Sequence, residues 1–326
     1  MSSIRWGLIG AGDIVRKRVA EALRDARDSE LAAVSRARAD LVERFARDVG
    51  APRWHASWRD LVRDPDIDAV YVATPVRLHA EQTIAAAEAG RHVICEKPMA
   101  MNVAECDRMI AACRANNVRL GVAYYRRFYP AVRRAAEILA SGEIGEPVFA
   151  QMMASEPFDP QPGAPRYWLV QRFESGGGPM ADFGCHRVEV LLHLLGPVRR
   201  ATSLVANVVL RREVEDTAVG LLHFEGGMCA VVVVTNAAAD RLDTLDLFGT
   251  KGSIRVAALN SGEIVVRGAD GDRRESHPPP PNVHVPLVED FVGAVRDGRD
   301  PAVDGQVGRA VAAVQDDIYA DTPPVR

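Results

Sequence analysis

The feature that most constrains the fold is a regular alternation of short apolar runs with helical segments in the first third of the chain. The strand-like runs, each separated from the next by a segment of helical periodicity, are 4–9, 31–34, 68–73, 92–95 and 118–122. Strands that alternate with helices pair in parallel through right-handed crossovers. The pattern therefore predicts a doubly wound α/β domain with a parallel sheet over residues 1–123.

The remainder of the chain, residues 124–326, has a different pattern. A strongly apolar helix is predicted over 179–195, and strand-like runs without intervening helices follow it at 200–210, 216–224, 228–235, 242–248, 252–257 and 263–267. Consecutive strands of this kind predict an antiparallel sheet. Two predicted helices, near 286–297 and 303–320, close the chain. The sequence does not show whether these two helices pack against the first domain.

Composition and charge exclude several classes of protein. The 40 basic and 44 acidic residues give a net charge of −4, so no basic excess indicates nucleic acid or an acidic membrane surface. No run approaches the ~20 apolar residues of a membrane span. Five scattered cysteines predict neither a disulfide framework nor a zinc site, and we expect no metal. With no signal-peptide pattern at the N-terminus, a cytoplasmic location is expected.

A glycine turn joins the first predicted strand to the first helix. The turn and the opening of the helix are formed by Gly10, Ala11, Gly12, Asp13 and Ile14. Glycines let the backbone approach a pyrophosphate, which binds the free N–H groups at a helix N-terminus. Val15 stands where the dinucleotide-binding pattern has its third glycine or alanine, and a larger side chain there is expected to loosen the helix or to force a compensating shift. An ordinary strand–turn–helix connection also explains the turn, but its place at the first crossover favours dinucleotide binding.

The end of the second predicted strand indicates which dinucleotide binds. An acid at this position would bind the ribose 2′-hydroxyl of NAD. The chain has Ser35 and Arg36 instead, with Arg38 close by and no acid before Asp40. A hydroxyl and a guanidinium suit a 2′-phosphate, because arginine pairs with phosphate oxygens bidentately. The pattern favours NADP over NAD, and a solvated basic loop is the alternative explanation.

Three further motifs identify a family. Thr74-Pro75 with His79 and Glu96-Lys97-Pro98 follow predicted strands, and the stretch GGGPMADFGCH at 176–186 opens the apolar helix. Together with the glycine turn and with Arg127-Phe128 before Pro130, these motifs resemble the Gfo/Idh/MocA oxidoreductases, named after glucose-fructose oxidoreductase and inositol 2-dehydrogenase. The resemblance covers essentially the whole chain.

The resemblance implies a nicotinamide-dependent dehydrogenase that acts on a CH–OH group of a sugar, cyclitol or similar polyol. It also implies an N-terminal Rossmann domain and a C-terminal α/β domain with a large open, mostly antiparallel sheet, which binds substrate. Family members commonly form dimers or tetramers through the exposed face of that sheet, so a homo-oligomer is expected. Two alternatives remain: a nicotinamide-binding sensor without turnover, and an NAD-dependent glycoside hydrolase or lyase of the same superfamily.

The resemblance assigns the family's catalytic Lys, Asp and His to Lys97, Asp182 and His186. Oxidation of an alcohol needs a hydride acceptor, a proton acceptor and a group that polarises the C–O bond. His186 is the candidate proton acceptor, and Lys97, at the carboxyl end of a parallel strand, is the candidate polarising group. Asp182 shares a helical face with His186 and would hold it or the substrate hydroxyl in place, although such a pair also occurs as a helix-stabilising contact.

Further residues are expected to contact the cofactor or the substrate. The cofactor candidates beyond the glycine turn and the second strand are Thr74, Pro75, His79, Glu96 and Lys97. The substrate candidates beside the catalytic residues are Tyr124, Arg127 and Trp168, of which Trp168 offers a face to a sugar ring and Arg127 is equally explained as a link between domains. Glu189 replaces the Asp of many family members, so a contact made by that acid is expected to be longer or differently aimed. The sequence does not distinguish a cis from a trans bond before Pro98.

Overall fold

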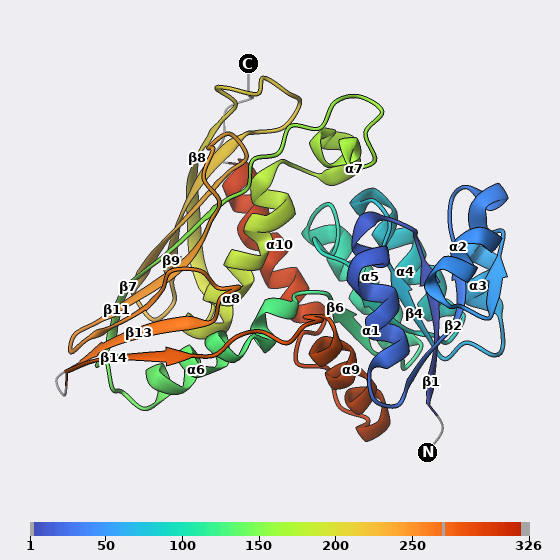
Figure 1. Ribbon diagram of the computed structural model, residues 1–326, viewed down its shortest axis with the longest axis horizontal. Coiled ribbons are helices and arrows are strands. Elements are labelled where there is room, and N and C mark those ends of the chain that lie inside the picture. Colours follow the sequence, from blue (N-terminus) through green and yellow to red (C-terminus); the bar gives the residue numbers. More distant parts are fainter. Residues whose placement is uncertain (1–2, 269–270, 321–326) are drawn as a thin grey trace. The chain divides into compact units, whose positions relative to one another are not determined.

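The structure is a computed structural model that describes residues 3–268 and 271–320 (Figure 1). Its residues divide into two compact units. The first unit comprises Met1–Tyr125 and Asn282–Ala312, and the second comprises Arg126–Pro281 and Ala313–Arg326. The helix α10 (Gly305–Ala320) therefore contributes residues to both units.

The first unit contains a six-stranded sheet with the strand order β3-β2-β1-β4-β5-β6, in which all neighbouring strands are parallel. The strands are β1 (Ile4–Ile9), β2 (Ser29–Ser35), β3 (Arg53–His55), β4 (Ala69–Val72), β5 (His92–Cys95) and β6 (Leu120–Val122). The order reverses between β1 and β4, which is the topology of a doubly wound sheet. The predicted fold class of this part of the chain is confirmed.

Helices connect the strands of this sheet. They are η1 (Val15–Val19) with α1 (Ala20–Asp25), η2 (Ala39–Leu41) with α2 (Val42–Val49), α3 (Trp58–Arg63), η3 (Val76–Leu78) with α4 (His79–Glu88), and α5 (Val103–Ala115). Local sequence sets their ends: the Asn102 side chain accepts a hydrogen bond from Glu105 N at 3.0 Å and caps α5, and Gly50 ends α2 with a left-handed φ of 75°. The helix α9 (Val285–Asp297) also belongs to this unit, and the Phe291 ring lies 5.5 Å from that of Trp6.

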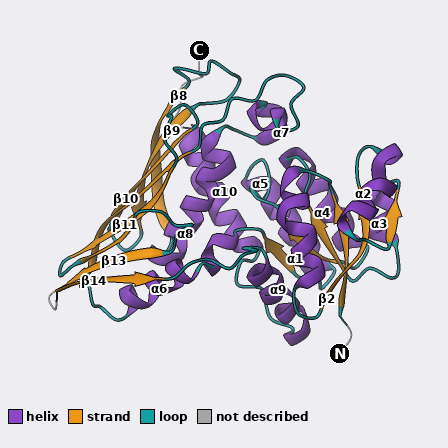
Figure 2. Cartoon of the chain, in the orientation of Figure 1, coloured by secondary structure: helices purple, strands orange, loops and turns teal. Residues whose placement is uncertain are grey.

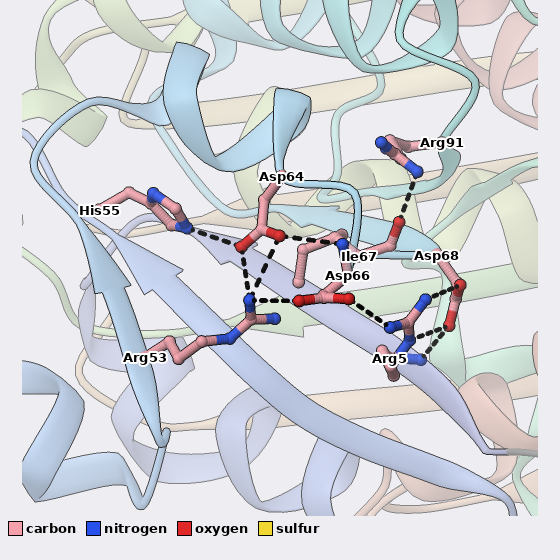
Figure 3. Close-up of polar contacts among 8 residues, drawn as sticks. All are labelled: Arg5, Arg53, His55, Asp64, Asp66, Ile67, Asp68 and Arg91. Atoms are coloured by element: carbon pink, nitrogen blue, oxygen red, sulfur yellow. Dashed lines mark hydrogen bonds and ion pairs between the residues drawn. The ribbon is translucent and has the colours of Figure 1, made fainter.

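An ionic cluster links β1 and β3 to the segment between α3 and β4 (Figure 3). Arg5, near the start of β1, donates to both carboxylate oxygens of Asp68, which directly precedes β4. Burial alone would raise the pKa of Asp68, but Arg5 outweighs it and the pKa is lowered. Asp64, between α3 and β4, pairs with Arg53 and His55 of β3, each at 2.9 Å. The cluster therefore ties β1 and β3 to the segment that leads into β4.

The second unit contains an eight-stranded sheet with the order β14-β13-β12-β11-β7-β10-β9-β8. The strands are β7 (Pro147–Ser155), β8 (Val198–Ala206), β9 (Thr217–Phe224), β10 (Cys229–Thr235), β11 (Leu242–Gly249), β12 (Ser253–Val256), β13 (Glu263–Gly268) and β14 (Gly271–Ser276). The pair β7–β10 is parallel, and the other neighbouring pairs are antiparallel. The expected mostly antiparallel sheet is confirmed.

Helices cover one face of this sheet (Figure 2). The helical segments of the unit, besides its parts of α10 and of η4 (Tyr125–Phe128), are α6 (Pro130–Ala140), η5 (Tyr167–Val170), α7 (Arg172–Ser175), η6 (Met180–Gly184) and α8 (Cys185–Leu195). Gly220 of β9 leaves room for Met180 and Ile318, so η6 and α10 approach the sheet closely. Along β9 and β10, buried residues alternate with more exposed ones. The alternation fits a sheet with one covered face.

Some elements differ from those expected. The strands β3, β7 and β14 and the helix α3 have no counterpart among the predicted elements. The strand predicted over 200–210 ends at Ala206, because the chain turns there and the Asp216 carboxylate accepts hydrogen bonds from the backbone of Val209 and Leu210. Among the described residues, no helix has the length and apolar content that crossing a membrane requires.

Candidate functional site

The glycine turn lies where β1, β2 and β4 end. Gly10 has a φ of +116° and donates to Ser35 O at 2.9 Å, and a Cβ atom on it would lie 2.1 Å from Ala73 O. Only glycine fits this position. Gly12, two residues later, has no atom within 4 Å of the place where a Cβ would be. The backbone at Gly12 is therefore open to a ligand, as a dinucleotide-binding turn requires.

The helix after the turn begins with a π-helical turn, η1. Val15, at the position of the third glycine of the dinucleotide-binding pattern, is fully buried within it. A π-turn is wider than an α-helical one. The larger side chain at this position thus coincides with a wider helical turn. Asp13 and Ile14 precede this turn, and exposed Asp13 pairs with Lys17 at 2.8 Å.

The end of β2 carries a cluster of arginines. Ser35 is buried, while the guanidiniums of Arg36 and Arg16 lie 5.7 and 5.0 Å from the centroid of the Phe45 ring. Burial and the charges of Arg16 and Arg38 lower the pKa of Arg36, whose Nε has no hydrogen-bond partner among the described residues. The first acid after β2, Asp40, pairs with Arg38 at 2.6 Å. This end of β2 therefore presents positive charge.

The loops that follow β4 and β5 are held together by His79. Its Nε2 lies 2.9 Å from Thr74 O and its Nδ1 lies 2.9 Å from Pro98 O. The side chain is buried, and burial lowers its pKa. Thr74 Oγ1 donates to Gln82 Oε1 at 2.7 Å, Pro75 directly precedes η3, and the Lys97–Pro98 bond is cis. His79 thus connects the backbone of the loop after β4 with that of the loop after β5.

Glu96 is the centre of a buried network beside Lys97. Its Oε1 accepts a hydrogen bond from Tyr71 Oη at 2.8 Å and lies 3.7 Å from His284 Nε2, while its Oε2 accepts from Lys97 N at 3.1 Å. Burial alone would raise the pKa of Glu96, but His284, Lys97 and Tyr71 outweigh it and lower the pKa. The Tyr125 ring lies 4.6 Å from that of His284. The lowered pKa keeps the Glu96 carboxylate ionised next to Lys97. Tyr71 and His284, which contact Glu96, were not among the residues predicted from the sequence.

In the second unit, Asp182 and His186 lie on consecutive helical segments. Asp182 is in the π-turn η6 and His186, which is buried, is in the first turn of α8. The four-residue spacing that a regular α-helix places on one face is therefore altered by the π-turn. Arg166 Nη2 lies 3.9 Å from Asp182 Oδ2, and its guanidinium lies 4.5 Å from the centroid of the Phe158 ring.

Arg127 pairs with an acid of the same unit. Its Nε donates to Glu189 Oε1 at 2.7 Å. Glu189 is fully buried on α8, and burial raises its pKa to about 7 although Arg127 acts against it. Of the other substrate candidates, Trp168 is half-buried in η5 and the Tyr124 side chain, in the first unit, is fully buried. Glu189, the acid that replaces the Asp of many family members, is therefore an ion-pair partner of Arg127.

The candidates form two groups, one in each unit. Those of the first unit, except Tyr124, follow β1, β2, β4 and β5, so they share the carboxyl edge of one sheet, where doubly wound folds bind ligands. Those of the second unit lie on η5, η6 and α8 or pair with α8. Within the described ranges, no group of three His, Cys, Asp or Glu side chains could hold a metal ion.

Comparison with known proteins agrees with this arrangement. Residues 4–124 match the family model described as "Oxidoreductase family, NAD-binding Rossmann fold", and residues 132–255 match "GFO/IDH/MocA C-terminal domain". The 1,5-anhydro-D-fructose reductase of Ensifer adhaerens is 32% identical, with 93% of this chain and 92% of that protein covered. The myo-inositol 2-dehydrogenase of Thermotoga maritima is 28% identical, with 94% and 92% covered.

Solved structures resemble the whole chain. Levoglucosan dehydrogenase in complex with NADH and levoglucosan superposes with a TM-score of 0.89 at 26% identity, covering 98% of this chain and 97% of that one. Aldose-aldose oxidoreductase from Caulobacter crescentus, complexed with glycerol, has the same TM-score, identity and coverage. The predicted family, the fold class and the oxidoreductase activity are confirmed. The chain belongs to the GFO/IDH/MocA family of NAD-binding oxidoreductases.

Proposed function

We propose that the protein catalyses reversible hydride transfer between a nicotinamide dinucleotide and a hydroxyl or carbonyl group of a sugar, cyclitol or similar polyol. The observation that carries this proposal is the carboxyl edge of the first sheet, where the open glycine turn and Lys97 follow strands of one sheet. The names of relatives, which include an anhydrofructose reductase, an inositol dehydrogenase and a levoglucosan dehydrogenase, support the class of substrate.

The residues of the first unit fit a dinucleotide. The pyrophosphate would bind the turn formed by Gly10, Ala11, Gly12, Asp13 and Ile14. Ser35 and Arg36 would bind the adenosine ribose, and the loops with Thr74, Pro75, His79, Glu96 and Lys97 would position the nicotinamide ring. When bound, the dinucleotide supplies or accepts the hydride. We propose that residues 1–123 bind the cofactor, and that substrate binding and oligomerisation belong to residues 124–326 except 124–125 and 282–312, which are part of the first unit.

Three residues would act on the substrate. The Lys97 ammonium would polarise the C–O bond, and the ionised Glu96 beside it favours the charged amine. His186 would take the proton from the hydroxyl, and Asp182 would orient the imidazole or the hydroxyl. Tyr124, Arg127 and Trp168 would complete the substrate-binding set, in which Glu189 fixes Arg127.

A panel of sugars, cyclitols and diols, assayed with each dinucleotide at 340 nm, tests the function. We expect at least one compound to be oxidised or reduced with stoichiometric change in the dinucleotide. Product formation without net change in reduced dinucleotide would instead indicate the hydrolase or lyase alternative. Binding of dinucleotide without turnover of any panel member would favour a sensor.

We propose NADP as the preferred dinucleotide, because Arg36 and Arg16 present positive charge at the end of β2 while the nearby Asp40 is engaged by Arg38. Arg36→Ala is expected to raise the Kd for NADP about 10- to 100-fold and to leave the Kd for NAD within about twofold, since a bidentate charged contact contributes 1.5–3 kcal/mol, or roughly that factor. Arg38→Ala is the matched control, with a smaller effect expected. Equal losses for both dinucleotides on titration calorimetry would contradict the preference.

We propose that the protein forms a dimer or tetramer through the uncovered face of the eight-stranded sheet. The strand register places Leu204, Val219, Val233 and Met153 in one row across β8, β9, β10 and β7. Leu204 is 77% exposed and Met153 is 38% exposed. A contiguous apolar row of this kind is typical of an interaction surface.

Leu204→Glu with Met153→Glu is expected to shift the protein to smaller species, because each carboxylate would be buried unpaired in the interface. Sedimentation velocity measures the change. The control Val208→Glu replaces a similarly exposed residue beyond the end of β8 and is expected to leave the assembly intact. A monomeric wild type, or an unchanged assembly in the double variant, would contradict this surface.

We also propose a cytoplasmic location. All five cysteines have free thiols, and Cys229 is exposed. An exposed free thiol is typical of a reducing compartment. Fractionation of the source cells, followed by detection of the protein, tests the location, and recovery outside the cytoplasm would contradict it.

A further inference from the structure

A buried acid lies at the start of the helical segment that carries Asp182. Glu215, two residues before the start of β9, is fully buried. Its Oε2 accepts a hydrogen bond from Gly178 N at 2.9 Å and its Oε1 accepts from Met180 N at 3.1 Å. Pro179, between them, has no N–H to donate. Glu215 therefore takes up the backbone donors at the beginning of η6.

Tyr319 of α10 completes this arrangement. Its hydroxyl donates to Glu215 Oε1 at 2.8 Å and accepts from Ala181 N at 3.1 Å. In the same region, Gln315 donates to Met180 O at 3.1 Å. No side chain within η6 itself caps its N-terminus. The free N–H groups of a helix start need acceptors, and here two residues distant in the sequence provide them.

The same two residues explain two glycines of the motif. A Cβ on Gly177 would lie 2.1 Å from the Tyr319 hydroxyl, and a Cβ on Gly178 would lie 2.3 Å from Glu215 O. Side chains at 177 and 178 are thus excluded by the groups that hold the helix start. The glycines of the motif therefore pack directly against Glu215 and Tyr319.

Burial and hydrogen bonding act on Glu215 in opposite directions, and burial prevails, so the pKa of its carboxyl group is raised. The hydrogen bonds that act against burial come from Gly178, Tyr319 and Met180. An acid at a helix N-terminus is also favoured by the helix dipole. Gly178 links Glu215 to Asp182. Its N–H donates to the Glu215 carboxyl group, and its carbonyl oxygen accepts a hydrogen bond from Asp182 N at 2.9 Å.

We propose that Glu215 and Tyr319 are positioning residues for the reaction, acting through the backbone of 178–181 to place Asp182 and His186. The proposal rests on the proposed function of those two residues. A small displacement of a catalytic group lowers turnover strongly, even when binding is retained. Sequence reasoning gave neither residue a role, because both act from elements far from the motif.

Tyr319→Phe is the principal test, since it keeps the ring and removes the hydroxyl, and Glu215→Gln keeps the shape and removes the charge. For both variants we expect kcat to fall about 10- to 100-fold, KM for the dinucleotide to change less than about twofold, and the pH profile of kcat to shift. Ser203→Ala is the matched control, because Ser203 donates to Ile318 O at 2.6 Å, next to Tyr319 but away from the motif. It is expected to retain wild-type kcat.

Two measurements on the intact protein do not need a substrate. Amide hydrogen exchange at Met180 and Ala181 is expected to accelerate in Tyr319→Phe, and the His186 imidazole titration, followed by NMR, is expected to shift. A folded Tyr319→Phe with wild-type kcat and pH profile, or with unchanged exchange and His186 titration, overturns the proposal. An equal loss of kcat in Ser203→Ala also overturns it. If the wild type turns over no panel compound, the proposed function fails, and the NMR result still decides the positioning role.

Discussion

Replacing Lys97 with Arg is expected to lower kcat about 100- to 1000-fold while the Kd for the dinucleotide changes less than about threefold. The substitution keeps the positive charge, so a role in charge alone would survive it. A guanidinium is larger and planar, and it does not release its proton at any pH that the enzyme meets. In the role proposed above, Lys97 donates a hydrogen bond that polarises the C–O bond, and loss of one such positioned donor costs about 10²- to 10³-fold in kcat. Steady-state kinetics on an active panel compound, with dinucleotide titration, measures both quantities.

The composition of the chain sharpens this test. Of its 40 basic residues, only Lys17, Lys97 and Lys251 are lysines. Arginine therefore serves at nearly all positions where charge alone is needed. Lys251→Arg, in the exposed turn between β11 and β12, is the matched control and is expected to leave kcat unchanged. Turnover near the wild-type value in Lys97→Arg would remove the role proposed for the ammonium.

The dinucleotide-binding edge of the first unit could be predicted because its signals are local. Gly10 and Gly12 stand in one turn, and Glu96 and Lys97 directly follow a strand whose apolar run is unambiguous. Parallel strands bring their carboxyl ends to one edge, so knowledge of the strands alone places these residues together. The alternation of strands and helices predicts a parallel sheet but not its order, β3-β2-β1-β4-β5-β6, which only the structure gives.

The partners of those residues could not be predicted in the same way. Tyr71 and His284 reach Glu96 from 25 and 188 residues away in the sequence, and no periodicity encodes such pairs. The strand β7 was missed because it begins at Pro147, a residue that argues against a central strand but is tolerated at the first position. The π-turns at Val15–Val19 and Met180–Gly184 also have no local signature, since helical patterns assume 3.6 residues per turn.

Gly10→Ala and Gly12→Ala are expected to separate the folding role of the glycine turn from its binding role. In Gly10→Ala the new Cβ would lie 2.1 Å from Ala73 O, and the φ of +116° disfavours a side chain, so the carbonyl end of β4 must move. We expect the free energy of unfolding to fall by about 3 kcal/mol, the sum of an overpacking and a backbone-strain cost. Urea denaturation of the protein without dinucleotide measures this loss.

Gly12→Ala is expected to have the opposite profile. No atom lies within 4 Å of its new Cβ, so the free energy of unfolding should stay within about 0.5 kcal/mol of the wild type. The methyl group would nevertheless occupy the place where the backbone must approach the pyrophosphate, and the Kd for the dinucleotide should rise about tenfold or more. Because the substitution leaves folding intact, unchanged dinucleotide affinity in Gly12→Ala has one explanation: the pyrophosphate does not bind at this turn. That result would remove the assignment of Gly10, Ala11 and Gly12 together with the proposed binding edge.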